Sequence, residues 1–316
     1  MRAALLGEIG AHPVLASIDG PSGDATADVV EIEMLAAPLN PLDVTVAAGR
    51  FGGGHPPLPY VPGIEGVGRR GDSGALVYAM GAGLGIARNG CAAERFNAPA
   101  ASLLAVPDGV APALAAALGT PGLAAWLALE WKGALQSGET VVVLGASGAG
   151  GQLALQAARL LCAGRVVAVG RGGARLDAAR RFADEAVEAE GDDYTARLAA
   201  ACPDGAQLVL DFVWGHQLEG ALPVLSLGGR VVQIGAAASP TASLPSALLR
   251  ARRATLYGFT NFAAPPDLLA ATYEKLVTEA AAGRLVLDGI ESFPLDRIGE
   301  AWELLLQGGS KVVMRP

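Results

Sequence analysis

A glycine-rich segment is the part of this sequence best suited to bind a charged ligand. It follows the apolar run Val141–Leu144 and precedes a segment whose apolar residues recur at helical spacing. A phosphate at a helix N-terminus meets unbonded N–H groups and the positive end of the helix dipole. Glycine there leaves room for a pyrophosphate, so we predict a dinucleotide site; the alternative is a turn that only packs helix on strand. The predicted contacts are Gly145, Ser147, Gly148, Ala149, Gly150 and Gly151.

The next apolar run, Val166–Val169, ends in a basic loop. Sites for NAD usually place an acid after this strand for the ribose hydroxyl. This chain has Gly170 and Arg171 there, with Arg175 close behind. Arginine suits a 2′-phosphate through bidentate hydrogen bonds, so the pattern favours NADP(H) over NAD(H). The alternative is that both arginines are simply solvated.

The glycine-rich segment opens a long alternation of apolar runs and helical segments. Strands buried on both faces look continuous rather than alternating, so this pattern predicts a helix-covered parallel sheet. A weaker strand is expected around Ala186-Val187, and the first hundred residues indicate short strands and turns. The last fifty residues are expected to return and complete the first domain. The five stronger runs are Val141–Leu144, Val166–Val169, Leu208–Leu210, Val231–Ile234 and Ala254–Tyr257.

The composition of the chain excludes several classes of protein. The chain has 316 residues, of which 52% are hydrophobic, and a formal net charge of −8. That apolar content excludes a disordered chain, and the acidic balance argues against nucleic acid as a partner. The most apolar region, residues 111–129, is interrupted by Gly119 and Pro121, so we expect no membrane span. With three scattered cysteines and no apolar leader at the start, we expect a cytoplasmic protein.

Several short motifs occur in a characteristic order. They are Leu39–Asp43 with Gly49–Phe51, Pro62–Gly68, Asn89–Glu94, Val106–Gly109, Leu118–Trp126, the glycine-rich segment, Gly228–Gly235 and Lys311–Val313. In this order the chain resembles the zinc-independent medium-chain dehydrogenase/reductases, particularly the quinone oxidoreductase group, over nearly its whole length. The resemblance implies an α/β protein with a β-rich, GroES-like catalytic domain (1–115 and 262–316) and a Rossmann domain (116–261). It also implies a homodimer, and a cleft between the domains for the nicotinamide.

The residues argue against a metal site. Zinc-using relatives carry Cys and His where this chain has Asn40 and Ile64. Zinc needs about four N, S or O ligands, and an aliphatic side chain supplies none. The histidines, His12, His55 and His216, have no metal-ligand spacing, so we predict no metal.

The resemblance also suggests catalytic candidates. It implies that Asn40 and Asp43 lie near the nicotinamide, where Asn40 would orient a substrate oxygen and Asp43 would transfer a proton. The alternatives are that Asn40 caps a turn before Pro41 and that Asp43 holds the local backbone. Many relatives have tyrosine where this chain has Phe51, which cannot donate a proton. His55 and Tyr60 lie nearby as substitute donors, although a histidine after three glycines is often inert.

Further cofactor contacts follow from the same resemblance and from strand ends. Thr120 matches a position close to the cofactor. The ends of the fifth and sixth predicted strands are expected to bind the carboxamide, since ligands bind at carboxyl ends in open α/β sheets. A cofactor contact by Lys311 is weighed against a solvated lysine. The strand-end residues are Gly235, Ala236, Phe259 and Asn261.

These observations predict an NADPH-dependent, metal-free reductase that transfers hydride to a quinone. A quinone takes hydride readily, and its reduced form is protonated by water. Two alternatives stay open: a reductase for an enone or enal in a biosynthetic pathway, and a non-catalytic NADPH-binding sensor. No lysine follows any tyrosine by four residues, and no G-x-S-x-G is present, so short-chain reductases and α/β-hydrolases are disfavoured.

Overall fold

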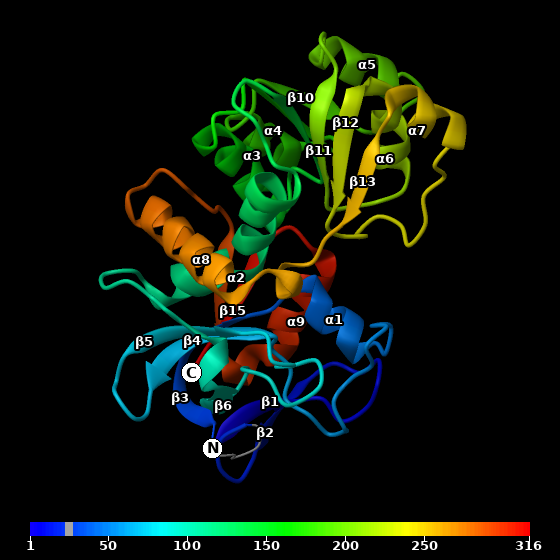
Figure 1. Ribbon diagram of the computed structural model, residues 1–316. Coiled ribbons are helices and arrows are strands. Elements are labelled where there is room, and N and C mark those ends of the chain that lie inside the picture. Colours follow the sequence, from blue (N-terminus) through cyan, green and yellow to red (C-terminus); the bar gives the residue numbers. More distant parts are fainter. Residues whose placement is uncertain (23–27) are drawn as a thin grey trace. The chain divides into compact units, whose positions relative to one another are not determined.

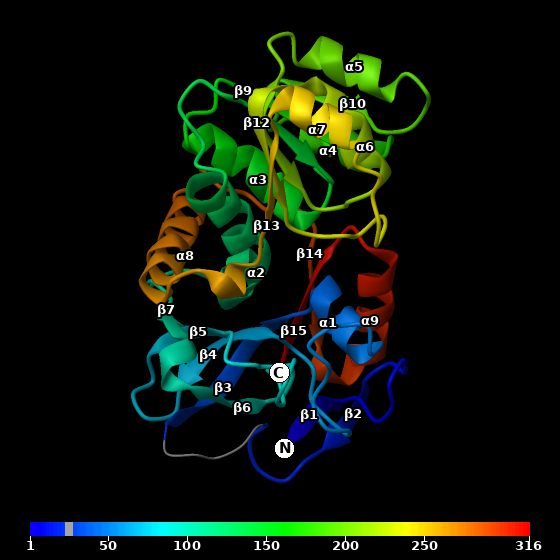
Figure 2. The ribbon, with the colours of Figure 1, turned by 45° about the vertical axis from the view of Figure 1, so that its right-hand side comes forward.

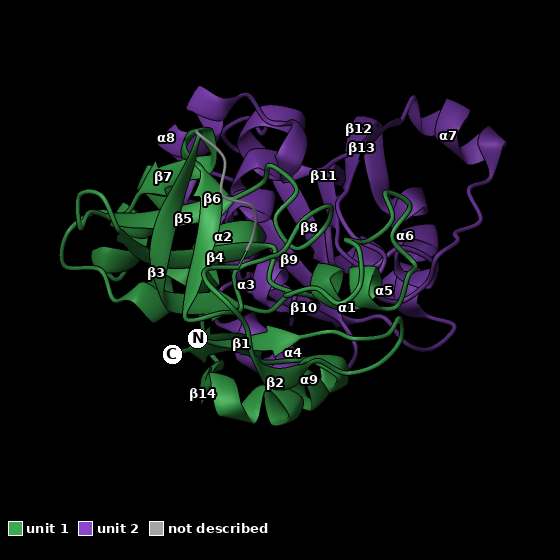
Figure 3. Ribbon diagram, turned by 90° about the horizontal axis from the view of Figure 1, so that it is seen from below, with its two compact units in different colours: residues 1–120, 273–316 green, residues 121–272 purple. Residues whose placement is uncertain are grey.

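The computed structural model describes residues 1–22 and 28–316, which divide into two units (Figure 1, Figure 3). Unit 1 comprises residues 1–120 and 273–316, and unit 2 comprises residues 121–272. The sequence places the domain boundaries after residues 115 and 261. The division falls instead inside two helices, α2 (Pro112–Leu127) and α8 (Pro266–Ala281).

Unit 2 is built on one parallel sheet. Its strand order is β10-β9-β8-β11-β12-β13, which in chain order is 3-2-1-4-5-6, the order of the dinucleotide-binding fold. The apolar runs read from the sequence form these strands, and the weak strand near Ala186 is present as β10. The strands are β8 (Thr140–Leu144), β9 (Arg165–Gly170), β10 (Glu185–Glu188), β11 (Ala206–Asp211), β12 (Leu225–Gln233) and β13 (Thr255–Gly258).

Helices cover this sheet on both faces, which explains its continuous apolar strands. The pair α3 and α4 lies on one side of the sheet, and α6 and α7 lie on the other (Figure 1, Figure 2). Strand β8 is fully buried, and so are the inner residues of β9 and β11. The helices are α3 (Ala149–Leu160), α4 (Ala174–Arg180), α5 (Tyr194–Ala201), α6 (His216–Ala221) and α7 (Ser246–Arg252).

Unit 1 is rich in β-structure, as the turn-rich N-terminal sequence predicts. Its larger sheet has the order β14-β15-β3-β4-β5-β7, and β6 also pairs with β3; β1 and β2 form a separate hairpin. Helices α1 (Pro41–Ala47) and α9 (Ile298–Gln307) belong to this unit. The strands are β1 (Arg2–Leu5), β2 (Val14–Ser17), β3 (Val29–Pro38), β4 (Glu65–Arg70), β5 (Leu76–Met80), β6 (Arg95–Pro99), β7 (Leu103–Ala105), β14 (Ile290–Pro294) and β15 (Lys311–Arg315).

The C-terminal strand completes unit 1, as expected from the sequence. Strand β15 pairs antiparallel with β3, with Val313 opposite Pro38 and Met314 opposite Ala37. This pairing brings Lys311 to the end of β3 and the start of α1. The predicted α/β class with one β-rich and one doubly wound unit is therefore confirmed.

The apolar helix α2 is less interrupted than its sequence indicates. Gly119 has non-helical backbone angles, but the helix continues through Pro121 to Leu127 and runs into a π-helical turn, η2 (Ala128–Lys132). The expected break is therefore a kink. By length and composition, residues 112–132 would suffice to cross a membrane, but most of this stretch is buried within the fold, as in a core helix.

Candidate nucleotide-binding turn and buried polar cluster

The glycine-rich segment forms the turn between β8 and α3. Gly145 has a φ of +80°, which glycine adopts without strain, and the N–H groups of Gly145 and Ala146 both donate to Val169 O. A Cβ on Gly151 would clash with Gly145 O and would lie 2.6 Å from Ala146 Cα. Gly151 therefore lets the start of α3 pack closely on the turn that follows β8.

Gly148, the residue before the first helical turn, has a different environment. The nearest heavy atom to a Cβ placed there would be Gly145 O at 3.6 Å. Protein atoms therefore leave this side of the turn open, while α3 begins at Ala149 with N–H groups that have no acceptor within the helix. Ser147 and Ala149 flank Gly148. This geometry fits a pyrophosphate.

Two acids that sequence reasoning missed lie against the basic loop after β9. Arg171 and Arg175 are both exposed. The Gly172 N–H donates to Glu190 Oε2 at 3.2 Å, and a Cβ on Gly172 would lie 2.6 Å from Glu188 Oε1. Strand β10 runs parallel to β9 and ends with Glu188 opposite Gly170, a register that the sequence alone does not give.

The other predicted cofactor residues in unit 2 lie at the ends of neighbouring strands. Gly235 and Ala236 follow β12, while Phe259 and Asn261 follow β13, which pairs with β12. The Phe259 N–H donates to Gln233 O at 2.9 Å, which ties the two strand ends together. The structure therefore brings these residues together at the carboxyl edge of the sheet.

A buried cluster in unit 1 gathers Asn40, Glu65 and Lys311. The Asn40 Nδ2 amide donates to Glu65 Oε1 at 2.8 Å. The Lys311 ammonium donates to Asn40 Oδ1 at 2.5 Å and lies 3.5 Å from Glu65 Oε1. Burial lowers the pKa of Lys311, while the Glu65 and Asp43 carboxylates oppose that change. Lys311 is thus a buried partner of these groups and not a solvated lysine.

The second oxygen of Glu65 has three donors of its own. The Thr120 N–H donates to Glu65 Oε2 at 2.7 Å, and the Thr120 hydroxyl donates at 2.9 Å. The Tyr78 hydroxyl donates to the same oxygen, and its ring stacks on Tyr273 with centroids 4.4 Å apart. Both Glu65 oxygens are therefore satisfied inside unit 1. Sequence reasoning missed the pairing of Glu65 with Tyr78, since nothing in the sequence links the two.

Asp43 holds backbone, which was one of its two predicted roles. Its Oδ1 accepts the N–H groups of Gly63 and Ile64 at 3.0 and 3.1 Å, and its Oδ2 accepts the Asn40 N–H at 2.8 Å. Burial raises the pKa of Asp43 to about 6, although these N–H groups and Lys311 lower it.

The remaining catalytic candidates lie in different surroundings. Phe51 is half-buried, and the exposed His55 has its Nδ1 2.7 Å from Pro56 O. Tyr60 is buried, and within the described residues its hydroxyl has no hydrogen-bond partner. Burial and the nearby Asp43 raise the pKa of Tyr60 to about 12, so its hydroxyl stays protonated at neutral pH.

The cluster around Glu65 does not fit zinc. Ile64 offers no donor atom, the Asn40 oxygen accepts from an ammonium, and both Glu65 oxygens are engaged. Throughout residues 1–22 and 28–316, no three His, Cys, Asp or Glu side chains form a group suited to a metal. A zinc ion would have to displace Lys311 and still lack ligands.

Comparisons with known proteins identify the family of this chain. Residues 149–281 match a family described as zinc-binding dehydrogenase. The chain is 25% identical to the quinone oxidoreductase-like protein 2 homolog of Nematostella vectensis, over 99% of this chain and 88% of that protein. It is 32% identical to the 2-methylene-furan-3-one reductase of Solanum lycopersicum, over 69% of this chain and 57% of that protein.

Among solved structures, the quinone oxidoreductase from Thermus thermophilus, which was also solved in complex with NADPH, superposes with a TM-score of 0.76. The alignment covers 100% of both chains at 31% identity. The chain therefore belongs to the medium-chain dehydrogenase/reductases, in the quinone oxidoreductase group.

Proposed function

We propose that this oxidoreductase uses NADPH to reduce a quinone without a metal. The observation that carries the proposal is the set of partners around Glu65, in which a buried ammonium and an amide surround the carboxylate in place of further metal ligands. Without a Lewis acid, an acceptor that takes hydride readily is favoured over an unactivated alcohol or ketone. NADPH supplies the hydride and water supplies the proton, which together give the hydroquinone and NADP⁺.

The test is loss of reduced-nicotinamide absorbance with NADPH and with NADH against quinones, enals and ketones. We expect the quinones to turn over fastest, and neither a chelator nor added zinc to change the rate. Ketone reduction that is abolished by a chelator would contradict the metal-free proposal.

A second candidate is reduction of an enone or enal. It is supported by the names of two relatives, the tomato 2-methylene-furan-3-one reductase and the mouse prostaglandin reductase-3. Such a reduction needs a proton donor, and the protonated, unpartnered hydroxyl of Tyr60 is suited to that role. Tyr60→Phe should then abolish enal turnover and leave quinone turnover intact. The third candidate, an NADPH sensor, requires tight NADPH binding with no turnover across the panel.

The preference for NADPH over NADH rests on two exposed arginines, Arg171 in the loop after β9 and Arg175 in the first turn of α4. Two positive side chains there suit a 2′-phosphate, whereas Glu188 and Glu190 near Gly172 oppose one. We expect Arg171→Ala with Arg175→Ala to raise the dissociation constant for NADPH about tenfold and to leave that for NADH unchanged. Glu188→Gln should tighten NADPH binding. Tighter binding of NADH by the unaltered protein would contradict the proposal.

We also propose a homodimer joined through β13. This strand is the edge of the parallel sheet, and Leu256 in it is 41% exposed. Helix α7, which precedes it, has no buried residue. An edge strand presents unpaired N–H and C=O groups that a second copy satisfies. Sedimentation should therefore show a dimer that Leu256→Lys converts to monomer.

A further inference from the structure

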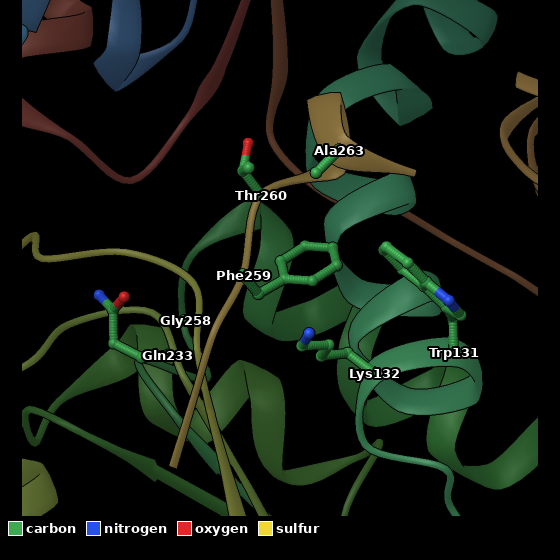
Figure 4. A pocket seen from close by; sticks show the side chains of 7 residues that line it. All are labelled: Trp131, Lys132, Gln233, Gly258, Phe259, Thr260 and Ala263. Carbon is green, nitrogen blue, oxygen red and sulfur yellow. The ribbon is translucent and has the colours of Figure 1, made fainter. Parts of the chain in front are cut away.

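A pocket on unit 2 is separate from the glycine-rich turn and from the arginine loop. It is lined by the two η2 residues Trp131 and Lys132, by the ends of β12 and β13, and by the segment after β13 (Figure 4). Its volume is about 340 Å³, at the lower end of the range for small-molecule sites. The other lining residues are Gln233, Gly258, Phe259, Thr260 and Ala263.

Lys132 gives this pocket a positive charge. Its ammonium lies 5.2 Å from the centroid of the Tyr257 ring and 5.8 Å from that of Trp131, within the range of cation–π attraction. Among the described residues, Lys132 forms no ion pair with a carboxylate. Figure 4 shows its side chain extending toward Phe259. The two rings therefore hold the ammonium in place without neutralising it.

The walls of the pocket are aromatic. The rings of Trp131 and Phe259 meet edge to face, with centroids 6.3 Å apart and an interplanar angle of 69°. Gln233 donates its Nε2 to Gly235 O at 3.0 Å, so its side-chain oxygen is the atom left for another donor. The η2 turn is π-helical, a distortion that often accompanies functional sites.

We propose that this pocket binds a planar aromatic anion, whose ring packs against Trp131 and Phe259 and whose anionic group pairs with Lys132. The aromatic walls favour a flat ring, because such pairs gain energy beyond the area that they bury. The unpaired ammonium favours a carboxylate or sulfonate over a neutral group. None of the lining residues belongs to the glycine-rich turn, and of the predicted cofactor contacts only Phe259 lines the pocket, so the ligand and the nucleotide are expected to bind together.

The test uses 2-naphthoate and its neutral counterpart 2-naphthalenemethanol, with binding followed by calorimetry and tryptophan fluorescence on the full-length protein. We expect naphthoate to bind about tenfold more tightly than the alcohol. Lys132→Met should abolish that difference, and Lys132→Arg should keep it. Arg180→Met removes one exposed positive charge from the same unit and should change nothing.

Saturating NADPH separates this pocket from the cofactor site. If naphthoate binds with unchanged affinity when NADPH is bound, the proposal holds. Competitive displacement of naphthoate by NADPH would mean that the pocket is part of the nicotinamide site and would overturn it. Equal affinities for the two probes, or an unaltered difference in Lys132→Met, would also overturn it.

Discussion

The ammonium of Lys311 lies 2.5 Å from Asn40 Oδ1, although the two residues are 271 positions apart in the chain. The C-terminal strand β15 therefore supplies the positive charge of a polar cluster whose negative charge, Glu65, comes from β4. The cluster thus links the return of the chain to the stability of unit 1.

Removal of Lys311 should destabilise the protein strongly. Lys311→Met leaves the fully buried Glu65 carboxylate without its cation, and breaking a buried pair in this way costs about 3–5 kcal/mol. Urea unfolding measures the change. The matched control is Arg297→Met, which removes a cation from an exposed pair with Glu300 and should cause no measurable loss. Equal effects of the two variants would show that the cluster contributes no special stability.

The stability of the protein should fall as the pH rises through the titration of Asp43. Burial raises the pKa of this carboxyl from 3.8 to about 6, so the folded state holds the proton more tightly than the unfolded chain does. The resulting stabilisation is complete below the unfolded pKa and is lost as the pH rises to the folded one. Its size is about 3 kcal/mol, since one pKa unit corresponds to roughly 1.4 kcal/mol.

The measurement for Asp43 is the free energy of unfolding at a series of pH values, for the unaltered protein and for Asp43→Asn. The variant loses an acceptor for the Asn40 N–H and should be less stable throughout. Its stability should nevertheless decline less between pH 3.8 and about 6, because the titrating group is absent. Parallel pH curves for the two proteins would contradict the raised pKa.

Two glycines of the same turn should respond in opposite ways to alanine. Gly148 has a φ of −80°, which alanine adopts, and protein atoms leave space for its methyl group. Gly148→Ala should therefore leave the free energy of unfolding unchanged and weaken NADPH binding about tenfold, because the methyl group obstructs the pyrophosphate.

In Gly151→Ala the new methyl group meets Gly145 O and Ala146. The resulting overpacking should lower the free energy of unfolding by about 1–3 kcal/mol, which exceeds the gain in helix propensity. Calorimetric titration with NADPH measures binding, and urea unfolding measures the free energy of unfolding of both variants. A loss of stability in Gly148→Ala would contradict the open space beside Gly148.

Much of unit 2 could be predicted from the sequence because its signals are local. The glycine-rich turn, the apolar strands and the basic loop each lie within a few neighbouring residues, and parallel strand order follows from their alternation with helices. The polar cluster of unit 1 could not be derived in this way. Lys311 and Glu65 are separated by 246 residues, and only the pairing of β15 with β3 brings them together.

The contacts that a residue makes were also harder to predict from the sequence than the element to which it belongs. The sequence locates Arg171 after β9 but does not reveal Glu188, because the contact depends on the register between β9 and β10. In the same way, Trp131 and Lys132 belong to an apolar helix whose terminal π-turn is set by packing and not by a sequence motif.

Asp211, at the end of β11, should position the nucleotide-binding turn without contacting the cofactor. It is completely buried, and its Oδ1 accepts the N–H groups of Val213 and Trp214 at 3.0 and 2.8 Å. Trp214 has a φ of +61°, which is unfavourable for a bulky residue. The two hydrogen bonds to Asp211 therefore help to hold the bend in the backbone directly after β11. The bend places Val213 against Gly145, where an added Cβ would lie 2.6 Å from Val213 Cγ1.

Asp211→Ala should therefore raise the dissociation constant for NADPH about tenfold and change kcat less than about twofold. The substitution weakens nucleotide binding but leaves the reacting groups in place. Asp211→Asn keeps an acceptor for Val213 and Trp214 and should bind NADPH nearly as well as the unaltered protein. The control is the exposed Asp204, whose change to alanine should alter neither constant. A fall in kcat with unchanged NADPH binding in Asp211→Ala would instead place Asp211 in the chemistry, because a positioning residue for the turn acts through the affinity for the nucleotide.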